Sequence, residues 1–244
     1  MTLRVPPFRA ARAALAGLAA GALLSGCAAT GDVADPVVRR LTWFSFLSGD
    51  DLHAACAPGS TSLRLVHNAV WDEDVRVIEA AGPATGEMTV SEQLYLGVDW
   101  SGVALGGEAG LLPWRGERFA TRWTADQAAA VKTALAADGA FAPLAAPVRL
   151  AGQGFFWTGS GCLDGKPWFH AWAAPGAAYD ALSFPAVLAP LLPAGRAFAA
   201  PRPQEETCPE QNRKAARAFF LTADADGVSG RADLPPPPFA RFLP

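Results

Sequence analysis

The chain is poor in the residues that most often build catalytic and metal centres. Its 244 residues include three histidines, four cysteines and two tyrosines. Cys56, Cys162 and Cys208 are far apart in sequence, so the close pairs typical of a zinc site are missing. The sequence also lacks a Gly-x-Ser-x-Gly elbow, a His-Glu-x-x-His helix and a glycine-rich phosphate loop. These absences make an enzyme the less favoured class.

An excess of basic residues is also missing. The chain has 20 lysines and arginines against 23 acidic residues, a net charge of -3. This balance argues against a nucleic-acid partner and against electrostatic docking on anionic lipid. Apolar residues make up 51% of the chain, which is enough to build a core.

The first 26 residues have the pattern of a secretory signal. Arg4, Arg9 and Arg12 precede an apolar run from Ala13 to Leu24 that is too short for a permanent membrane span of about 20 residues. Leu24-Ser25-Gly26-Cys27 then resembles the lipobox of bacterial lipoproteins at every position. The alternative is an ordinary secretory signal followed by a chance cysteine.

The lipoprotein resemblance implies cleavage before Cys27 and attachment of diacylglyceryl to its thiol, often with a further acyl chain such as palmitate on the new amino group. Two or more acyl chains hold a protein firmly on a membrane, so membrane lipid is the expected partner. Ala28, in place of aspartate, resembles outer-membrane sorting and favours the outer over the inner membrane. The domain then faces the periplasm, where an envelope protein or ligand of unknown identity is its second partner.

The remaining chain divides into three parts. Residues 27–38 are predicted to form a tether, residues 39–200 an α+β periplasmic domain, and residues 201–244 a C-terminal helix and proline-rich tail packed on that domain. The order of strands, helix, hairpin and helix predicts an antiparallel sheet with helices packed on one face. The expected strands are Leu41–Leu47, Ser62–Ala69, Asp74–Glu79, Met88–Leu96 and Arg118–Trp123. The expected helices are Asp50–Ala55, opened by a capping box of Ser48 and Asp51, about Thr124–Ala137, opened by a capping box of Thr124 and Gln127, about Tyr179–Leu192, and Thr207–Leu221.

A β-hairpin at residues 155–173 is the strongest tertiary signal. Asp164-Gly165 favours a two-residue type I′ turn between its strands. That turn places Gly161 opposite Trp168 and Trp157 opposite Trp172, all on one side of the hairpin. Trp157, Trp168 and Trp172 either bind a sugar, peptide or lipid or are covered by a helix, and core packing is the favoured interpretation.

The cysteines that follow Cys27 are expected to include a disulfide, because export leads to an oxidising compartment. Cys56 and Cys208 lie in predicted connecting segments, whereas Cys162 lies in a hairpin strand. We therefore predict a Cys56–Cys208 bond, slightly ahead of Cys162–Cys208.

Two candidate sites remain. His67 or His170, with the acids near Asp72, would serve a periplasmic hydrolase if the fold brought them together. The loop at residues 222–233 resembles an EF-hand calcium loop, with Asp224, Asp226 and Asp233 as weak candidate ligands. Thr222 replaces its first aspartate, and four prolines follow it, so a surface turn is favoured. The sequence predicts a structural or binding lipoprotein, with a hydrolase and a calcium-dependent module as alternatives.

Overall fold

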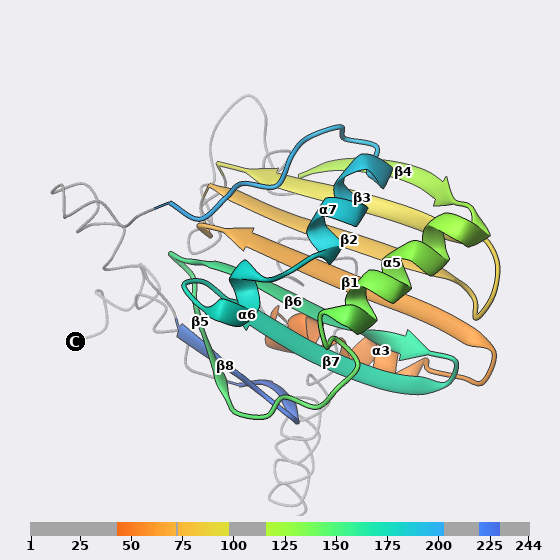
Figure 1. Ribbon diagram of the computed structural model, residues 1–244, viewed down its shortest axis with the longest axis horizontal. Helices are drawn as coiled ribbons and strands as arrows, with labels where there is room; N and C mark the ends of the chain where they lie inside the picture. Colours follow the sequence, from red (N-terminus) through yellow and green to blue (C-terminus); the bar gives the residue numbers. More distant parts are fainter. Residues whose placement is uncertain (1–42, 72, 98–115, 203–219, 230–244) are drawn as a thin grey trace, which may run out of the picture.

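The domain is built on one six-stranded antiparallel sheet (Figure 1). The computed structural model describes residues 43–71, 73–97, 116–202 and 220–229. The order of the strands across the sheet is β4-β3-β2-β1-β6-β7. Their bounds are β1 (Ser60–Ala69), β2 (Asp74–Pro83), β3 (Met88–Leu96), β4 (Glu117–Trp123), β6 (Phe155–Leu163) and β7 (Lys166–Ala173). The four predicted strands between residues 62 and 123 and the predicted hairpin are therefore confirmed.

The β6–β7 hairpin has the predicted turn and register. Asp164 and Gly165 both have positive φ, at 50° and 77°, as a type I′ turn requires. Gly161 pairs with Trp168, and Trp157 pairs with Trp172. Because β7 is an edge strand, its proline at position 167 is tolerated. The hairpin joins the rest of the sheet through β6, which pairs with β1.

One face of the sheet is covered by helices, and we call it the helical face. Figure 1 shows α5, α6 and α7 on this near side of the sheet. Helix α5 (Ala125–Ala137) begins with the predicted capping box between Thr124 and Gln127. The predicted helix at Tyr179–Leu192 is instead three short pieces, α6 (Ala177–Asp180), α7 (Phe184–Leu188) and the 3-10 turn η1 (Ala189–Leu191). The prolines in α7 and η1 both occupy first-turn positions, because proline can open a helix but disrupts its interior.

The opposite face, which we call the outer face, is covered by other elements. Residues 43–48 are helical, α3 (Asp50–Ala54) follows them, and a small sheet in the order β5-β8-β9 completes the cover. The bounds of the small sheet are β5 (Val148–Ala151), β8 (Phe220–Asp224) and β9 (Gly227–Ser229). The α+β class is confirmed, and the large sheet lies between two hydrophobic clusters, one on each face.

The predicted strand at Leu41–Leu47 is wrong where the structure describes it. Trp43, Phe46 and Leu47 are spaced as one face of a helix, and all three are buried on the outer face. Burial of this stripe outweighs the strand preference of the aromatic residues. Ser48 does not cap α3 as expected, because its hydroxyl accepts a hydrogen bond from the N–H of Val228 at 2.7 Å.

The predicted C-terminal helix does not extend to Leu221, because Phe220 and Leu221 lie in strand β8. Leu221 is buried in the outer-face cluster, so pairing with β5 and burial decide its conformation. The rest of that helix, the proline-rich tail, the signal and the tether lie outside the described residues.

Candidate functional site

A cluster of charged and aromatic side chains lies on the helical face of β1, β2 and β3. His67 of β1 is directly opposite Arg76 of β2, and Glu92 of β3 is diagonal to Arg76. All three side chains are buried; Arg76 and Glu92 are fully inaccessible to solvent. Charged side chains are rarely buried unless they have partners, so the neighbours of this cluster determine what it can do.

The segment at residues 194–198, which we call the strap, supplies those neighbours. It follows η1 and passes over β3 and β2, as the blue segment after α7 in Figure 1. Arg76 donates from Nη1 to the carbonyl of Arg196 at 2.7 Å and from Nη2 to the carbonyl of Ala197 at 2.5 Å. The N–H of Ala194 donates to Glu92 Oε2 at 3.0 Å. The strap is thus bound to the sheet through its backbone.

An aromatic ring of the strap completes the cover. The Phe198 ring lies edge-on to Trp157 at 4.8 Å and to His67 at 5.3 Å between centroids. The Arg76 guanidinium lies 5.0 Å from the same ring. His67 in turn packs over Trp157 at 4.5 Å. Phe198 is therefore partly buried against one charged and two aromatic side chains.

Burial governs the ionisation of this cluster. Burial, assisted by the charge of Arg76, lowers the pKa of His67 to about 3, so its imidazole is neutral. Burial raises the pKa of Glu92, opposed by the Ala194 N–H and by Arg76. The closest approach of Glu92 Oε1 to Arg76 Nη1 is 3.9 Å. Neither that oxygen nor His67 Nδ1 has a hydrogen-bond partner among the described residues.

His170 does not join this cluster. It lies on β7, two strands from His67, which corresponds to about 10 Å at the usual strand spacing. Its Nδ1 pairs with the carbonyl oxygen of Ala142 at 3.1 Å, and its ring packs against Trp172 at 4.6 Å. Asp72 lies outside the described residues. The structure therefore does not bring the two candidate histidines together.

The tryptophan face of the hairpin is covered, as the favoured interpretation predicts. Trp157, Trp168 and Trp172 are all buried in the helical-face cluster. Phe184 of α7 packs edge-on against Trp157 at 4.9 Å, and Phe141 packs against Trp168 at 5.0 Å. These rings are core residues, and only Trp157 also contacts the strap.

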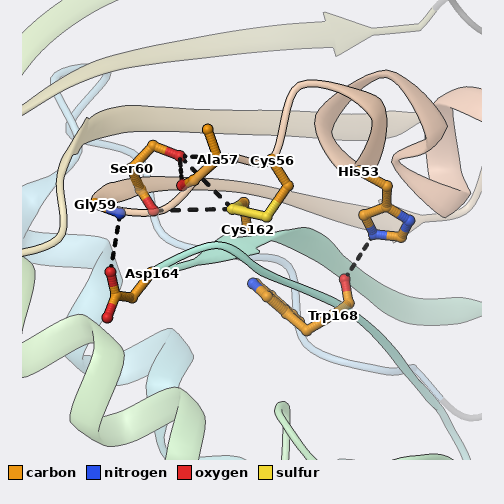
Figure 2. Close-up of a disulfide and its surroundings, with 8 residues drawn as sticks. All are labelled: His53, Cys56, Ala57, Gly59, Ser60, Cys162, Asp164 and Trp168. Carbon is orange, nitrogen blue, oxygen red and sulfur yellow. Dashed lines mark hydrogen bonds between the residues drawn. A yellow bond between two sulfur atoms is a disulfide. The ribbon is translucent and has the colours of Figure 1, made fainter.

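Cys56 is disulfide-bonded to Cys162, with 5.3 Å between their Cα atoms (Figure 2). The predicted Cys56–Cys208 pairing is therefore wrong in its second partner, and Cys208 lies outside the described residues. The turn after α3 lies beside β6, which brings Cys56 to the thiol of the strand. The same loop also bonds to the hairpin turn, because Gly59 N–H donates to Asp164 Oδ1 at 3.0 Å.

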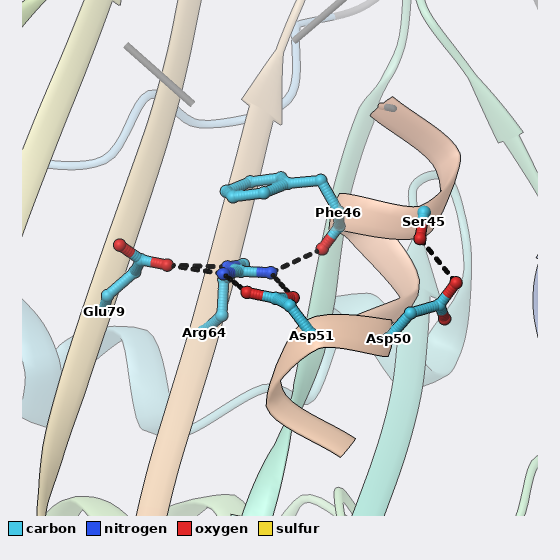
Figure 3. A network of polar contacts seen from close by, with 6 residues as sticks. All are labelled: Ser45, Phe46, Asp50, Asp51, Arg64 and Glu79. Carbon is cyan, nitrogen blue, oxygen red and sulfur yellow. Dashed lines mark hydrogen bonds and ion pairs between the residues drawn. The ribbon is translucent and has the colours of Figure 1, made fainter. Parts of the chain in front are cut away.

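A second buried arginine lies on the outer face (Figure 3). Arg64 donates to both carboxylate oxygens of Asp51, at 2.8 and 2.7 Å, and to Glu79 at 2.8 Å. It also donates to the carbonyl of Phe46 and stacks on that ring at 3.8 Å. These contacts bind α3 and the preceding helix to the sheet.

The described part of the calcium-loop candidate is a tight hairpin. Asp224 pairs with Gly227 and Thr222 pairs with Ser229, so β8 and β9 are joined by two residues. An EF-hand loop instead wraps twelve residues around the ion. The Asp224 side chain accepts a hydrogen bond from the N–H of Asp226 at 3.0 Å. Asp233 lies outside the described residues, and within the described ones no group of three or more His, Cys, Asp or Glu is placed to hold a metal.

Sequence reasoning missed Arg76, Glu92 and Phe198. One signal for Arg76 was present. Alternation along the strand places Arg76 and Ile78 on one apolar face of the sheet, and Val75 and Val77 on the opposite face. Nothing in the sequence indicates that a segment more than 100 residues further on covers that arginine.

Comparison with known proteins gives no relative for this chain. No family model matches it, and neither a curated protein nor a solved structure matches it. Among the described helices, none is long and apolar enough to cross a membrane. Function therefore has to be inferred from the sequence motifs and from the geometry of the domain.

Proposed function

We propose that the protein is an envelope lipoprotein that is anchored to a membrane by acylated Cys27 and exposes its α+β domain to the periplasm as a binding or structural module. The observation that carries the proposal is the sequence Leu24-Ser25-Gly26-Cys27 behind a basic and then apolar N-terminal stretch. The alanine at position 28 favours the outer membrane over the inner one.

The disulfide supports the exported location. Such bonds persist in oxidising compartments and are rare where thiols are kept reduced. Cys56 and Cys162 are separated by 106 residues, and their bond joins the turn after α3 to the end of β6. A bond of this kind contributes to stability only where it stays oxidised, which fits a periplasmic domain.

The state of the histidines supports binding over catalysis. A general base acts best when its pKa lies near the working pH and its nitrogen reaches the substrate. His67 has a pKa of about 3 and is covered by Phe198, and His170 is engaged by the Ala142 carbonyl. A hydrolase that uses either histidine is therefore the less supported alternative, and the β8–β9 hairpin gives the calcium alternative no support.

The anchor is tested by labelling cells with a fatty-acid analogue. The wild type and a Cys208→Ala variant, which loses a thiol but keeps the lipobox, are expected to take up label equally. Cys27→Ser is expected to take up none and to accumulate as uncut precursor or in soluble form. Equal labelling of Cys27→Ser and wild type would overturn the proposal. Separation of the two membranes of labelled cells then tests the outer-membrane assignment, and affinity capture from detergent-solubilised membranes identifies an envelope partner.

A further inference from the structure

The strap contacts the charged side chains of the sheet through backbone carbonyl and N–H groups, which any other peptide also has. Its contacts with Arg76 and Glu92 are made by two carbonyls and one backbone N–H. The side chain of Arg196 points to solvent, and Ala194 and Ala197 are too small to fill a pocket. Phe198 is the one strap side chain that packs against aromatic rings. The strap is therefore recognised as a backbone plus a single aromatic ring.

We propose that His67, Arg76, Glu92 and Trp157 form a binding site for a ligand that carries a carboxylate, a neighbouring N–H donor and an aromatic side chain, and that the strap occupies this site as a displaceable internal substitute. The inference deepens the proposed function by naming the ligand class of the binding module. It does not depend on the lipid anchor.

Arg76 sets the requirement for a carboxylate. Its Nη1 and Nη2 each donate to one oxygen of the strap, and this end of a guanidinium fits the two oxygens of one carboxylate. Arg76 already has an ion pair with Asp74 at 3.4 Å and lies 3.9 Å from Glu92, so a ligand carboxylate would replace the strap carbonyls at Nη1 and Nη2. The strap carbonyls occupy the two donors that such a carboxylate would need.

Glu92 sets the requirement for an N–H donor close to the carboxylate. It accepts the Ala194 N–H, and its other oxygen lies 3.9 Å from Arg76 Nη1. An amino-acid residue at a chain end carries its carboxylate and its N–H on the same carbon, which suits this separation. The aromatic side chain of the ligand would then take the place of the Phe198 ring against Trp157 and Arg76.

Two atoms of the cluster also lack partners, as do five other buried polar atoms of the described residues. His67 Nδ1 and Glu92 Oε1 are buried and have no hydrogen-bond partner among the described residues. A buried polar group without a partner costs free energy, and a buried ion pair stabilises a fold little compared with apolar packing. A site held for binding accounts for retaining the buried charges of Arg76 and Glu92 at this cost.

Two sources share this chemistry, the C-terminal residue of a peptide and a free aromatic amino acid. The test uses the full chain in detergent with N-acetyl-Ala-Phe as its free acid, the same peptide as its C-terminal amide, and free phenylalanine. Calorimetry measures binding. We expect the acid to bind and the amide to fail, and binding of free phenylalanine would identify the amino acid as a sufficient ligand. Binding of the amide as tightly as the acid would overturn the role of Arg76.

Tryptic cleavage between Arg196 and Ala197 reports displacement of the strap, because Arg76 holds the carbonyl of the bond that trypsin cuts. Saturating acid peptide is expected to speed this cleavage by about tenfold, since a ligand that binds only the open form shifts the population toward it. Cleavage after Lys132, inside α5, is the control for general unfolding and should not change.

Phe198→Ala separates the site from the stability of the fold. Removing the ring weakens the strap while Arg76 stays in place, so the acid peptide should bind about tenfold more tightly. Phe141→Ala is the matched control, because its ring packs on Trp168 on the same face but away from the strap. The inference would be overturned if the acid peptide neither bound nor sped cleavage at Arg196, both in the wild type and in Phe198→Ala. Fatty-acid labelling of Cys27 would be unaffected by that result.

Discussion

Two buried arginines on neighbouring strands show how differently the two faces of the sheet are held. Arg64 binds two carboxylates on the outer face, each about one-third exposed, with a covalent bond between Cys56 and Cys162 nearby. Arg76 donates to two backbone carbonyls on the helical face at 2.7 and 2.5 Å, whereas its acidic neighbours Asp74 and Glu92 are 3.4 and 3.9 Å away.

This difference distinguishes a structural contact around Arg64, which we call the clamp, from the proposed binding site around Arg76, which we call the site. The partners of Arg64 are fixed side chains that fasten α3 to the sheet, whereas the main partners of Arg76 are carbonyls of a strap outside any helix or strand. Backbone groups that make no ladder or helix contacts can be exchanged for those of a ligand more readily. The outer face is thus held by contacts between fixed side chains, whereas the helical face combines a hydrophobic core with a strap that a ligand can displace.

Removal of the disulfide is expected to give the largest loss of stability. Closing a loop of 106 residues contributes about 3–5 kcal/mol through the entropy of the unfolded chain. The comparison is between Cys208→Ala alone and Cys56→Ala combined with Cys208→Ala, because the second thiol could otherwise form a new bond. Urea unfolding measures the difference. Equal midpoints of the two variants would show that the outer face does not depend on its covalent bond.

Replacing each arginine by methionine tests the comparison directly. Arg76→Met should destabilise the fold by about 3 kcal/mol, because Glu92 is fully buried and loses its cationic neighbour. Arg64→Met should cost about 1 kcal/mol, because water can reach Asp51 and Glu79. Only Arg76→Met should speed tryptic cleavage at Arg196. Faster cleavage in Arg64→Met as well would break the distinction between clamp and site.

The free energy of unfolding should depend on pH because His67 is buried in its neutral form. Folding lowers the pKa of His67 from 6.5 to about 3, so stability is fully present above pH 6.5 and is lost as the pH falls below it. The loss between pH 6.5 and 5 is about 2 kcal/mol at 1.36 kcal/mol per pH unit. The raised pKa of Glu92 acts in the opposite direction, because its folded form takes up a proton more readily as the pH falls.

His67→Phe should flatten the profile between pH 6.5 and 5, as measured by urea unfolding at each pH. His170→Phe is the comparison, because burial also lowers the pKa of His170 but the ring is only half-buried. A profile as steep in His67→Phe as in wild type would show that the loss comes from other groups.

The sequence predicted local structure well where a short motif of neighbouring residues determines the backbone conformation. Asp164-Gly165 defined the turn and therefore the register of two strands, and Thr124 with Gln127 defined the start of α5. It failed for Trp43, Phe46 and Leu47, whose strand preference is overridden by burial as one helical stripe. Propensity is a weak guide wherever tertiary burial is large.

The candidate site was only partly predictable for a related reason. His67 was identified from its residue type, but its neighbours come from β2, β3 and a strap near residue 196. Contacts between residues so far apart in the chain depend on the order of the strands and on the path of an irregular segment. No local pattern in the sequence reveals either one. The Cys56–Cys162 bond was missed for the same reason, because it depends on α3 lying beside β6.

The smallest predicted effect concerns the junction of α5 with α7 on the helical face. Asp138, at the end of α5, accepts hydrogen bonds from the N–H groups of Ser183 and Phe184 at 2.8 and 2.7 Å. It also accepts the Ser183 hydroxyl at 2.8 Å. The carboxylate therefore satisfies backbone donors at the start of α7, the role that a capping side chain usually plays.

Asp138→Ala should lower the free energy of unfolding by about 1 kcal/mol, the usual value of such a cap. Asp126→Ala is the matched control, since Asp126 is an exposed residue in the first turn of the same helix. Because Phe184 contacts Trp157, which also contacts Phe198, loosening α7 should speed cleavage at Arg196 slightly as well. A loss of stability with no change in that cleavage would show that the strap is held by Arg76 and Glu92 independently of the helices beside it.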